Sequence, residues 1–171
     1  MKVETKLRLA RTVRDFRLPR YAEIPNVGLY LEQATKYVCE HLEPLGEFSL
    51  TPSMISNYVK KGLIANPVKK LYGREQIAYL FFIAVAKSVL SLDALTGFIR
   101  LQQSTYSLAK AYDYFCQEFE NLLQFTFENK DTIEKVGEDT TDEKRLLYTC
   151  IVAAVQKVYL EKCLEAIKEE C

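Results

Sequence analysis

Glycine and proline are scarce in this chain of 171 residues, which holds six glycines and five prolines. A β-sandwich needs a turn about every 8–12 residues, so such a low content of turn-forming residues argues against that class. The long stretches without either residue favour helices. With 49% hydrophobic and 27% charged residues, the composition is that of a globular protein, neither disordered nor fibrous. We therefore predict an all-α fold.

Signals of catalysis are also missing. The chain has a single histidine, His41, which lies beside Glu40 and Glu43 with no serine or cysteine motif near it. There is no glycine-rich phosphate loop and no H-E-x-x-H, G-x-S-x-G or EF-hand pattern. We expect a solvated histidine, no enzymatic activity, no cofactor and no metal site.

The chain has no long apolar run and no C-x-x-C pair. Its longest apolar run, residues 77–86, ends at Lys87, well short of the roughly 20 residues that cross a bilayer. Five cysteines form an odd set without a secretory signal sequence, which is typical of reduced thiols in a cytoplasmic protein. We expect no membrane association and regard buried, inert thiols as the main interpretation, with a thiol sensor at Cys116 as the alternative.

Charges of the two signs are equal in number but unevenly placed. Residues 1–90 hold 14 basic and 8 acidic side chains, a net charge of +6, and residues 91–171 hold 9 and 15, a net charge of −6. The first half therefore suits a polyanion and the second half would repel one. Pairing of the two halves with each other is the alternative explanation.

Residues 1–20 form a predicted basic N-terminal arm. Its arginines recur every third residue, and the apolar residues between them have helical spacing. Such an arm can bind phosphates or a minor groove, or it can simply be a solvated terminus. The arginines are Arg8, Arg11, Arg14, Arg17 and Arg20.

Residues 21–100 contain the predicted DNA-binding domain. Asn26 is the predicted cap of a first helix that ends before Pro44. Thr51 followed by Pro52 predicts the start of a second helix, which Gly62 ends as a left-handed residue. The following alternation of apolar and basic residues at 68–72 is typical of a short exposed hairpin, or wing.

The second of these helices has one apolar face and one polar, positive face. A helix of this kind fits the major groove when its polar face carries small side chains that reach base edges and lysines that neutralise phosphates. A charged face that merely meets solvent is the alternative. The predicted DNA-contacting residues are Ser53, Ser56, Asn57, Lys60, Lys61, Lys69, Lys70, Tyr72 and Arg74.

Residues 74–90 are apolar on most sides and predict a buried central helix, and Ser91 is the predicted cap of the next one. Residues 101–171 form a predicted antiparallel helical hairpin for dimerisation or sensing, with a polar linker at 129–141 and a final helix from about residue 142. The aromatic residues of the hairpin suit a core or dimer interface better than a pocket for an apolar effector. The predicted dimer seam consists of Leu101, Leu108, Phe115 and Leu122.

Two families resemble this chain. Residues 51–64 (TPSMISNYVKKGLI), Pro67, Tyr72 and residues 91–95 (SLDAL) are similar to the winged helix-turn-helix of MerR-type transcription regulators. The chain departs from that pattern at Ser56, where an arginine is usual, and at Asn57, where an aromatic residue is usual. Over residues 16–123 it more closely resembles a bacterial family called domain of unknown function 1836. The segments that carry this second resemblance are 18–21 (LPRY), 23–26 (EIPN), 29–31 (LYL), 57–61 (NYVKK) and 68–70 (VKK).

The sequence thus predicts a MerR-like winged helix-turn-helix followed by a helical hairpin, in a homodimeric cytoplasmic regulator that binds double-stranded DNA. The alternative is an adaptor that keeps the winged-helix scaffold but binds another protein. A small-molecule effector has no motif in its favour, and an enzyme is the least favoured class.

Overall fold

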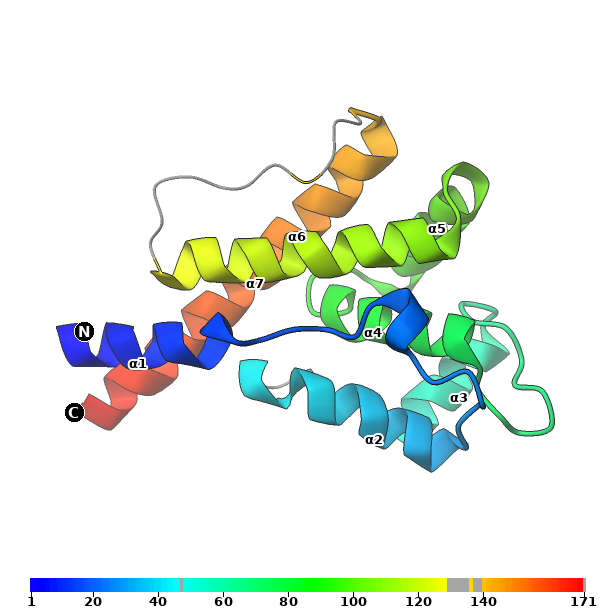
Figure 1. The fold of residues 1–171 in the computed structure, drawn as a ribbon, viewed down its shortest axis with the longest axis horizontal. Helices are drawn as coiled ribbons and strands as arrows, with labels where there is room; N and C mark the ends of the chain where they lie inside the picture. Colours follow the sequence, from blue (N-terminus) through cyan, green and yellow to red (C-terminus); the bar gives the residue numbers. More distant parts are fainter. Residues whose placement is uncertain (47, 129–135, 137–139, 171) are drawn as a thin grey trace.

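Seven α-helices follow one another in the computed structural model, which describes residues 1–46, 48–128, 136 and 140–170 (Figure 1). In these residues the only β-type pairings are two isolated antiparallel bridges, so the prediction of an all-α fold is confirmed. The predicted linker at 129–141 lies mostly outside the described residues, as does Cys171. The helices are α1 (Val3–Arg14), α2 (Leu31–Leu42), α3 (Pro52–Lys60), α4 (Arg74–Ala86), α5 (Leu92–Thr105), α6 (Leu108–Glu128) and α7 (Asp142–Glu170).

Helix α4 lies at the centre of the molecule, as predicted. Eight of its residues are buried, and Ile77, Leu80, Phe81 and Ile83 have no exposed surface. Helices α2, α6 and α7 pack around it, which is why its sequence is apolar on every side. A single apolar core extends from Leu9 to Ala166 and joins all three predicted parts of the chain.

The ends of α3 follow the local sequence. Thr51 Oγ1 accepts a hydrogen bond from the Met54 amide at 3.2 Å, and Pro52 occupies the first helical position. At the other end Gly62 has φ of +72°, and the Leu63 amide donates to the Tyr58 carbonyl at 2.9 Å. This is the Schellman arrangement, and both predicted ends of the helix are confirmed.

Helix α2 begins later than predicted. Its first residue is Leu31, and Asn26 does not cap it. Gly28 has φ of +75°, and the backbone of Leu29 pairs with that of Tyr72 through hydrogen bonds of 2.9 and 2.8 Å. The bridge to Tyr72 holds the chain extended before the helix, and the sequence around Asn26 carries no local sign of this distant partner.

The predicted antiparallel hairpin is wrong in two respects. Tyr106 has extended backbone angles, φ −133° and ψ 151°, and separates α5 from α6, so the apolar seam does not run along one helix. Helices α6 and α7 are also parallel: Tyr106 contacts Thr141 near the start of both helices, and Phe127 contacts Tyr159 further along both (Figure 1).

Chain length permits this parallel arrangement. Thirteen residues separate Glu128 from Asp142, and an extended segment of that size reaches about 43 Å. Helix α6 has 21 residues, which gives it a length of about 31 Å. The connection is therefore long enough to return to the start of α6, whereas a short linker would have enforced an antiparallel pair.

Two residues of the predicted dimer seam are not available to a partner. Phe115 and Leu122 are 2% and 4% exposed because α6 turns them toward the core of its own chain. Leu101 and Leu108 are half-buried and line cavities between α5, α6 and α7. The prediction that these four residues form a dimer seam is therefore wrong for Phe115 and Leu122.

The N-terminal arm is folded onto the acidic half of the chain rather than free. Helix α1 packs against α6 and against the end of α7, where Arg8 pairs with Glu169 at 2.6 Å. Arg14 pairs with Glu128 at 3.5 Å. Pairing between the two halves, the alternative explanation of the charge asymmetry, thus accounts for part of it.

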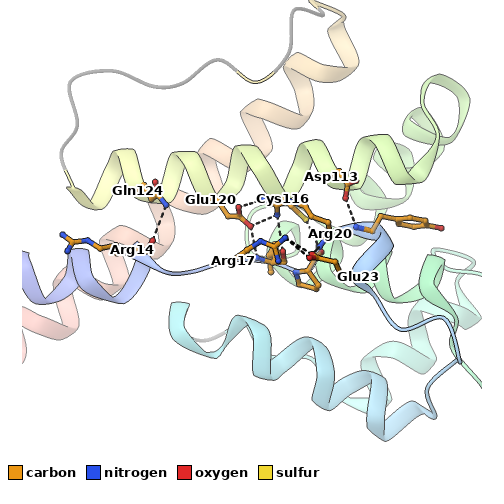
Figure 2. Close-up of polar contacts among 11 residues, drawn as sticks. Arg14, Arg17, Arg20, Glu23, Asp113, Cys116, Glu120 and Gln124 are labelled. Carbon is orange, nitrogen blue, oxygen red and sulfur yellow. Dashed lines mark hydrogen bonds and ion pairs between the residues drawn. The ribbon is translucent and has the colours of Figure 1, made fainter.

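The extended segment after α1 is fixed to α6 by a part-buried ion pair (Figure 2). The Arg20 guanidinium donates to both oxygens of Glu120, at 2.7 and 2.6 Å, and the Leu18 amide donates to the same carboxylate at 2.8 Å. The Tyr21 amide donates to Asp113 at 2.7 Å. A bidentate arginine with a further backbone donor is a strong arrangement, and it fixes the segment that leads into α2.

Candidate nucleic-acid interface

The outer face of α3 consists of exposed polar and basic side chains. The opposite face carries Ile55 and Tyr58, which are 0% and 5% exposed, and it packs on α2. This amphipathic division holds the helix on the surface with its polar face outward. The exposed residues of that face are Ser53, Ser56, Asn57, Lys60 and Lys61, all of which the sequence predicted as DNA contacts.

A two-residue hairpin turn follows α3, as the sequence predicted. The Val68 amide donates to Leu71 at 3.1 Å, and the Leu71 amide donates back to Val68 at 2.9 Å. The two residues between them, Lys69 and Lys70, have φ of +50° and +67°. These angles are those of a type I′ turn, which projects both lysines away from the hairpin into solvent.

Lysine is an unusual choice for these two positions. Type I′ turns strongly prefer asparagine and glycine, because other side chains clash with the backbone when φ is positive. The segment contains no Asn-Gly pair, so the sequence predicted a hairpin but not the turn type.

The hairpin lies beside α3 at one end of the molecule (Figure 1, right-hand side). The bridge between Tyr72 and Leu29 attaches its base to the segment before α2. Lys60, Lys61, Lys69 and Lys70 are all exposed, and in the described part of the chain none of the four forms an ion pair. We call these four lysines, together with Ser53, Ser56 and Asn57 on the polar face of α3, the basic surface.

Two predicted DNA contacts do not belong to the basic surface. Tyr72 is 5% exposed because its backbone bridge to Leu29 turns the ring into the core, so the prediction for this residue is wrong. The Arg74 guanidinium faces inward, where it donates to the carbonyls of Ile24 and Ala22 at 3.0 and 3.2 Å. Arg74 therefore ties α4 to the preceding segment rather than presenting a free cation.

Lys87, which ends the apolar run at residues 77–86, is also turned inward. Its ammonium donates to the Ser49 carbonyl and lies 3.9 Å from the Met54 sulfur. Burial lowers the pKa of this lysine. It fixes the loop before α3 to the end of α4, a positioning role that the sequence did not reveal.

His41, the single histidine of the chain, packs against aromatic rings. His41 is half-buried between the rings of Tyr37 and Phe81, and its Nδ1 lies 2.8 Å from the Tyr37 carbonyl oxygen, so it is not the solvated histidine expected.

No group of three or more metal-ligating side chains occurs among the described residues. Within the same residues no helix is both long and apolar enough to span a bilayer.

The described cysteines are free thiols. Burial raises the pKa of Cys116 to about 12 and that of Cys150 to about 11. Because the thiolate is the reactive form, both side chains are inert near neutral pH. Cys116 is fully buried, with its sulfur 3.9 Å from the Pro19 carbonyl oxygen.

Comparison with known proteins gave one match. A sequence profile described as "Domain of unknown function (DUF1836)" matches residues 19–115, more than half of the chain. The matched range extends from the Arg20 segment through α2, α3, the hairpin, α4 and α5 into the first part of α6. No curated protein and no solved structure gave a significant match.

Proposed function

The chain belongs to the family described as Domain of unknown function (DUF1836), and from this starting point we propose that it is a winged helix-turn-helix regulator of transcription that binds double-stranded DNA in the cytoplasm. The observation that carries the proposal is the basic surface. Four lysines and three small polar side chains are exposed together on α3 and the hairpin, and the described residues supply no acid to pair with the lysines.

The order of elements supports the same proposal. Helix α2, the turn at 43–50, helix α3 and the two-residue hairpin follow one another in the order that the resemblance to MerR-type regulators implies. In helix-turn-helix proteins the first residues of the second helix contact base edges in the major groove. Ser53 lies in the first turn of α3, and Ser56 and Asn57 are its fifth and sixth residues; Asn57 is suited to a bidentate contact with adenine.

Contrast with the arginines strengthens this interpretation. Arg8, Arg14 and Arg20 are held by carboxylates of the chain itself, whereas the lysines of the basic surface are not. A duplex would therefore meet the α3 end of the molecule without displacing internal ion pairs. Counterion release from four phosphate contacts gives a slope near −4 for log K against log salt concentration per protomer.

Fluorescence anisotropy with a labelled duplex of mixed sequence tests the proposal directly. We expect binding at about 50 mM salt with a slope near −4 per protomer, and we expect Lys69→Glu with Lys70→Glu to abolish it. Lys6→Glu with Arg11→Glu is the matched control, since it changes the charge by the same amount on exposed positions of α1. Unchanged binding by the hairpin variant would overturn the assignment of the wing.

A homodimer is part of the proposal, but on a different face from the one first predicted. Helix α7 carries apolar residues at seven-residue intervals on its outer side, where Leu146, Leu160 and Ile167 are 50%, 58% and 41% exposed and Ala153 lies between them. These residues fill one position of each heptad and form a narrow apolar stripe along the 29 residues of the helix, which a second helix can cover. We propose that a second copy of the chain covers this stripe.

The adaptor remains the second candidate, and the chemistry at Ser56 and Asn57 favours it. At these positions the MerR-type pattern has an arginine and an aromatic residue, and their absence removes two expected contacts to DNA. Failure to bind any duplex at about 50 mM salt, together with a protein partner recovered by pull-down that binds through the tyrosine-rich or acidic surface, would favour the adaptor over the regulator.

A further inference from the structure

A cavity of about 220 Å³ lies between the end of α5, the start of α6 and the first turns of α7. Phe98, Leu101, Ala111 and Leu147 form its apolar wall. A smaller space of about 40 Å³ continues from it toward α4 and shares Phe98, Ala111 and Leu147. No residue of α3 or of the hairpin lines either space, so binding here is independent of the proposed DNA contacts.

The break between α5 and α6 creates this cavity and fixes its edge. The Tyr106 hydroxyl lies 2.6 Å from Thr141 Oγ1, which joins the break to the start of α7. The Gln102 amide donates to the Tyr106 carbonyl at 2.8 Å, and its oxygen accepts from the Tyr79 hydroxyl at 2.9 Å. Because these groups are already held by one another, the cavity is largely preformed, as ligand sites usually are.

The polar side of the cavity is predominantly positive. Among the described residues that line it, Lys110 and Lys144 are the cations and Glu143 is the acid. Each ammonium lies over a tyrosine ring, with Lys110 Nζ 5.1 Å from the Tyr106 centroid and Lys144 Nζ 4.9 Å from the Tyr114 centroid. An exposed cation–π contact contributes only about 0.5–1 kcal/mol, so an anion can recruit the exposed Lys110 ammonium at little cost. Lys144 Nζ also donates to the Val136 carbonyl at 2.7 Å, which leaves two of its three N–H donors for an anion.

The start of α6 adds to the positive potential. Both helices begin beside the cavity, and helix N-termini carry partial positive charge, but Asp142 and Glu143 offset it in the first turn of α7, whereas α6 has no acid in its first turn. Glu118 also interacts with Lys144. Burial raises the pKa of Glu118, while a hydrogen bond from Tyr114 and the charge of Lys144 act in the opposite direction. The site therefore combines an apolar body with a cationic edge.

We infer that this cavity binds a small amphipathic carboxylate, with the apolar part between Phe98, Ala111 and Leu147 and the carboxylate at Lys110 and Lys144. The volume sets the size of the ligand. An apolar cavity of about 150 Å³ holds benzene, so about 220 Å³ accommodates one ring with a short acid chain or an aliphatic acid of similar size.

Isothermal titration calorimetry with 3-phenylpropanoate tests the inference. At roughly 0.5 kcal/mol per heavy atom, between the limits for fragments and for drug-sized ligands, we expect a Kd of about 0.1 mM. The neutral 3-phenylpropan-1-ol should bind about tenfold more weakly, because it lacks the charge for the lysines. Acetate should give no heat. Equal binding of the acid and the alcohol would overturn the charged part of the inference, and no binding of either would overturn all of it.

Two variants locate the site. Ala111→Phe fills the space that both cavities share and should abolish binding of 3-phenylpropanoate. Lys110→Gln should weaken it about tenfold, while Lys36→Gln on α2, a control at a side chain that is 75% exposed, should leave it unchanged. If circular dichroism shows that Ala111→Phe does not fold, the comparison of Lys110→Gln with Lys36→Gln still tests whether the ligand binds in this cavity. Equal affinity of Lys110→Gln and Lys36→Gln would place the ligand elsewhere.

Discussion

Glu118 is a buried carboxyl in the middle of α6. Its side chain is 4% exposed, and Oε2 has no hydrogen-bond partner among the described residues. Burial raises its pKa above the ordinary value of 4.5, although a hydrogen bond from Tyr114 and the charge of Lys144 act in the opposite direction. A carboxyl with a raised pKa in the folded state binds its proton more tightly there than in the unfolded chain.

This difference predicts a pH-dependent cost to stability. The free energy of unfolding loses the contribution of Glu118 as the pH rises from 4.5 through the raised pKa of the folded state. Glu118→Gln removes the charge and keeps the shape, so we expect it to stabilise the protein by about 1 kcal/mol at pH 7.5. At pH 4, where the carboxyl is largely protonated in both states, the gain should shrink. Urea unfolding followed by circular dichroism at the two pH values measures it.

Glu32→Gln is the matched control for this prediction. Glu32 lies exposed on α2, so losing its charge should change the free energy of unfolding by less than about 0.5 kcal/mol at either pH. A Glu118→Gln variant that is no more stable than the natural chain at pH 7.5 would show that Tyr114 and Lys144 already compensate for the burial of the charge.

At the scale of a single element, the hairpin at 68–71 allows the effect of the lysine charges on DNA binding to be measured apart from the effect of the turn conformation on stability. Lys69→Asn with Lys70→Gly supplies the pair that type I′ turns prefer, so we expect the free energy of unfolding to rise by about 1 kcal/mol. The same change removes two phosphate ligands, and the slope of log K against log salt should become less negative by about 1.8. Anisotropy titrations and urea unfolding of one protein preparation report both effects.

The control for the hairpin keeps the strained turn and removes only the charge. Lys69→Gln with Lys70→Gln should lose the same DNA affinity without any gain in stability. If the Asn-Gly variant is stabilised but binds duplex as tightly as the natural chain, the lysines have another role and the proposal for the hairpin fails.

On the scale of the whole molecule, the unpaired lysines of the basic surface and the ion-paired arginines lie at different places. The basic surface lies at one end, while the two termini meet at the other, where Arg8 pairs with Glu169 (Figure 1). The zero net charge therefore hides a molecule with one open cationic end. Such a distribution favours oriented approach to a polyanion.

We predict that the chain forms a homodimer through the outer apolar stripe of α7. Burying its leucines and isoleucine against a second copy gains about 1.5–3 kcal/mol for each fully buried side chain. Light scattering after size exclusion should give twice the chain mass of 19.7 kDa. Leu160→Lys should reduce it to the mass of one chain, because it places a charge at the centre of the seam.

Val27→Lys is the control for the stripe, since Val27 is an apolar residue that is 83% exposed and lies outside α7. It should leave the mass unchanged. A natural chain that is monomeric at tens of micromolar concentration would contradict the assignment of this face to a second copy.

Much of the fold depends on helix caps and apolar patterns that can be read from neighbouring residues in the sequence. Thr51, Pro52 and Gly62 determined both ends of α3, Ser91 caps α5 through a hydrogen bond of 3.2 Å, and the continuous apolar run determined that α4 is buried. The exposure of the polar face of α3 followed from its spacing alone. Each of these features involves residues within about four positions of one another, so the sequence contains both partners.

The features that only the tertiary structure decided all involve partners far apart along the chain. The bridge between Leu29 and Tyr72 delayed α2 and buried Tyr72, and the inward turn of Arg74 depended on the carbonyls of Ile24 and Ala22. Helical periodicity shows that a face is apolar but not which neighbour covers it. The sequence by itself therefore determined the ends of α3, the cap of α5, the burial of α4 and the exposed polar face of α3. Packing decided where α2 begins, that α6 and α7 run parallel, that Phe115 faces inward, and that the rest of the chain leaves the α7 stripe uncovered.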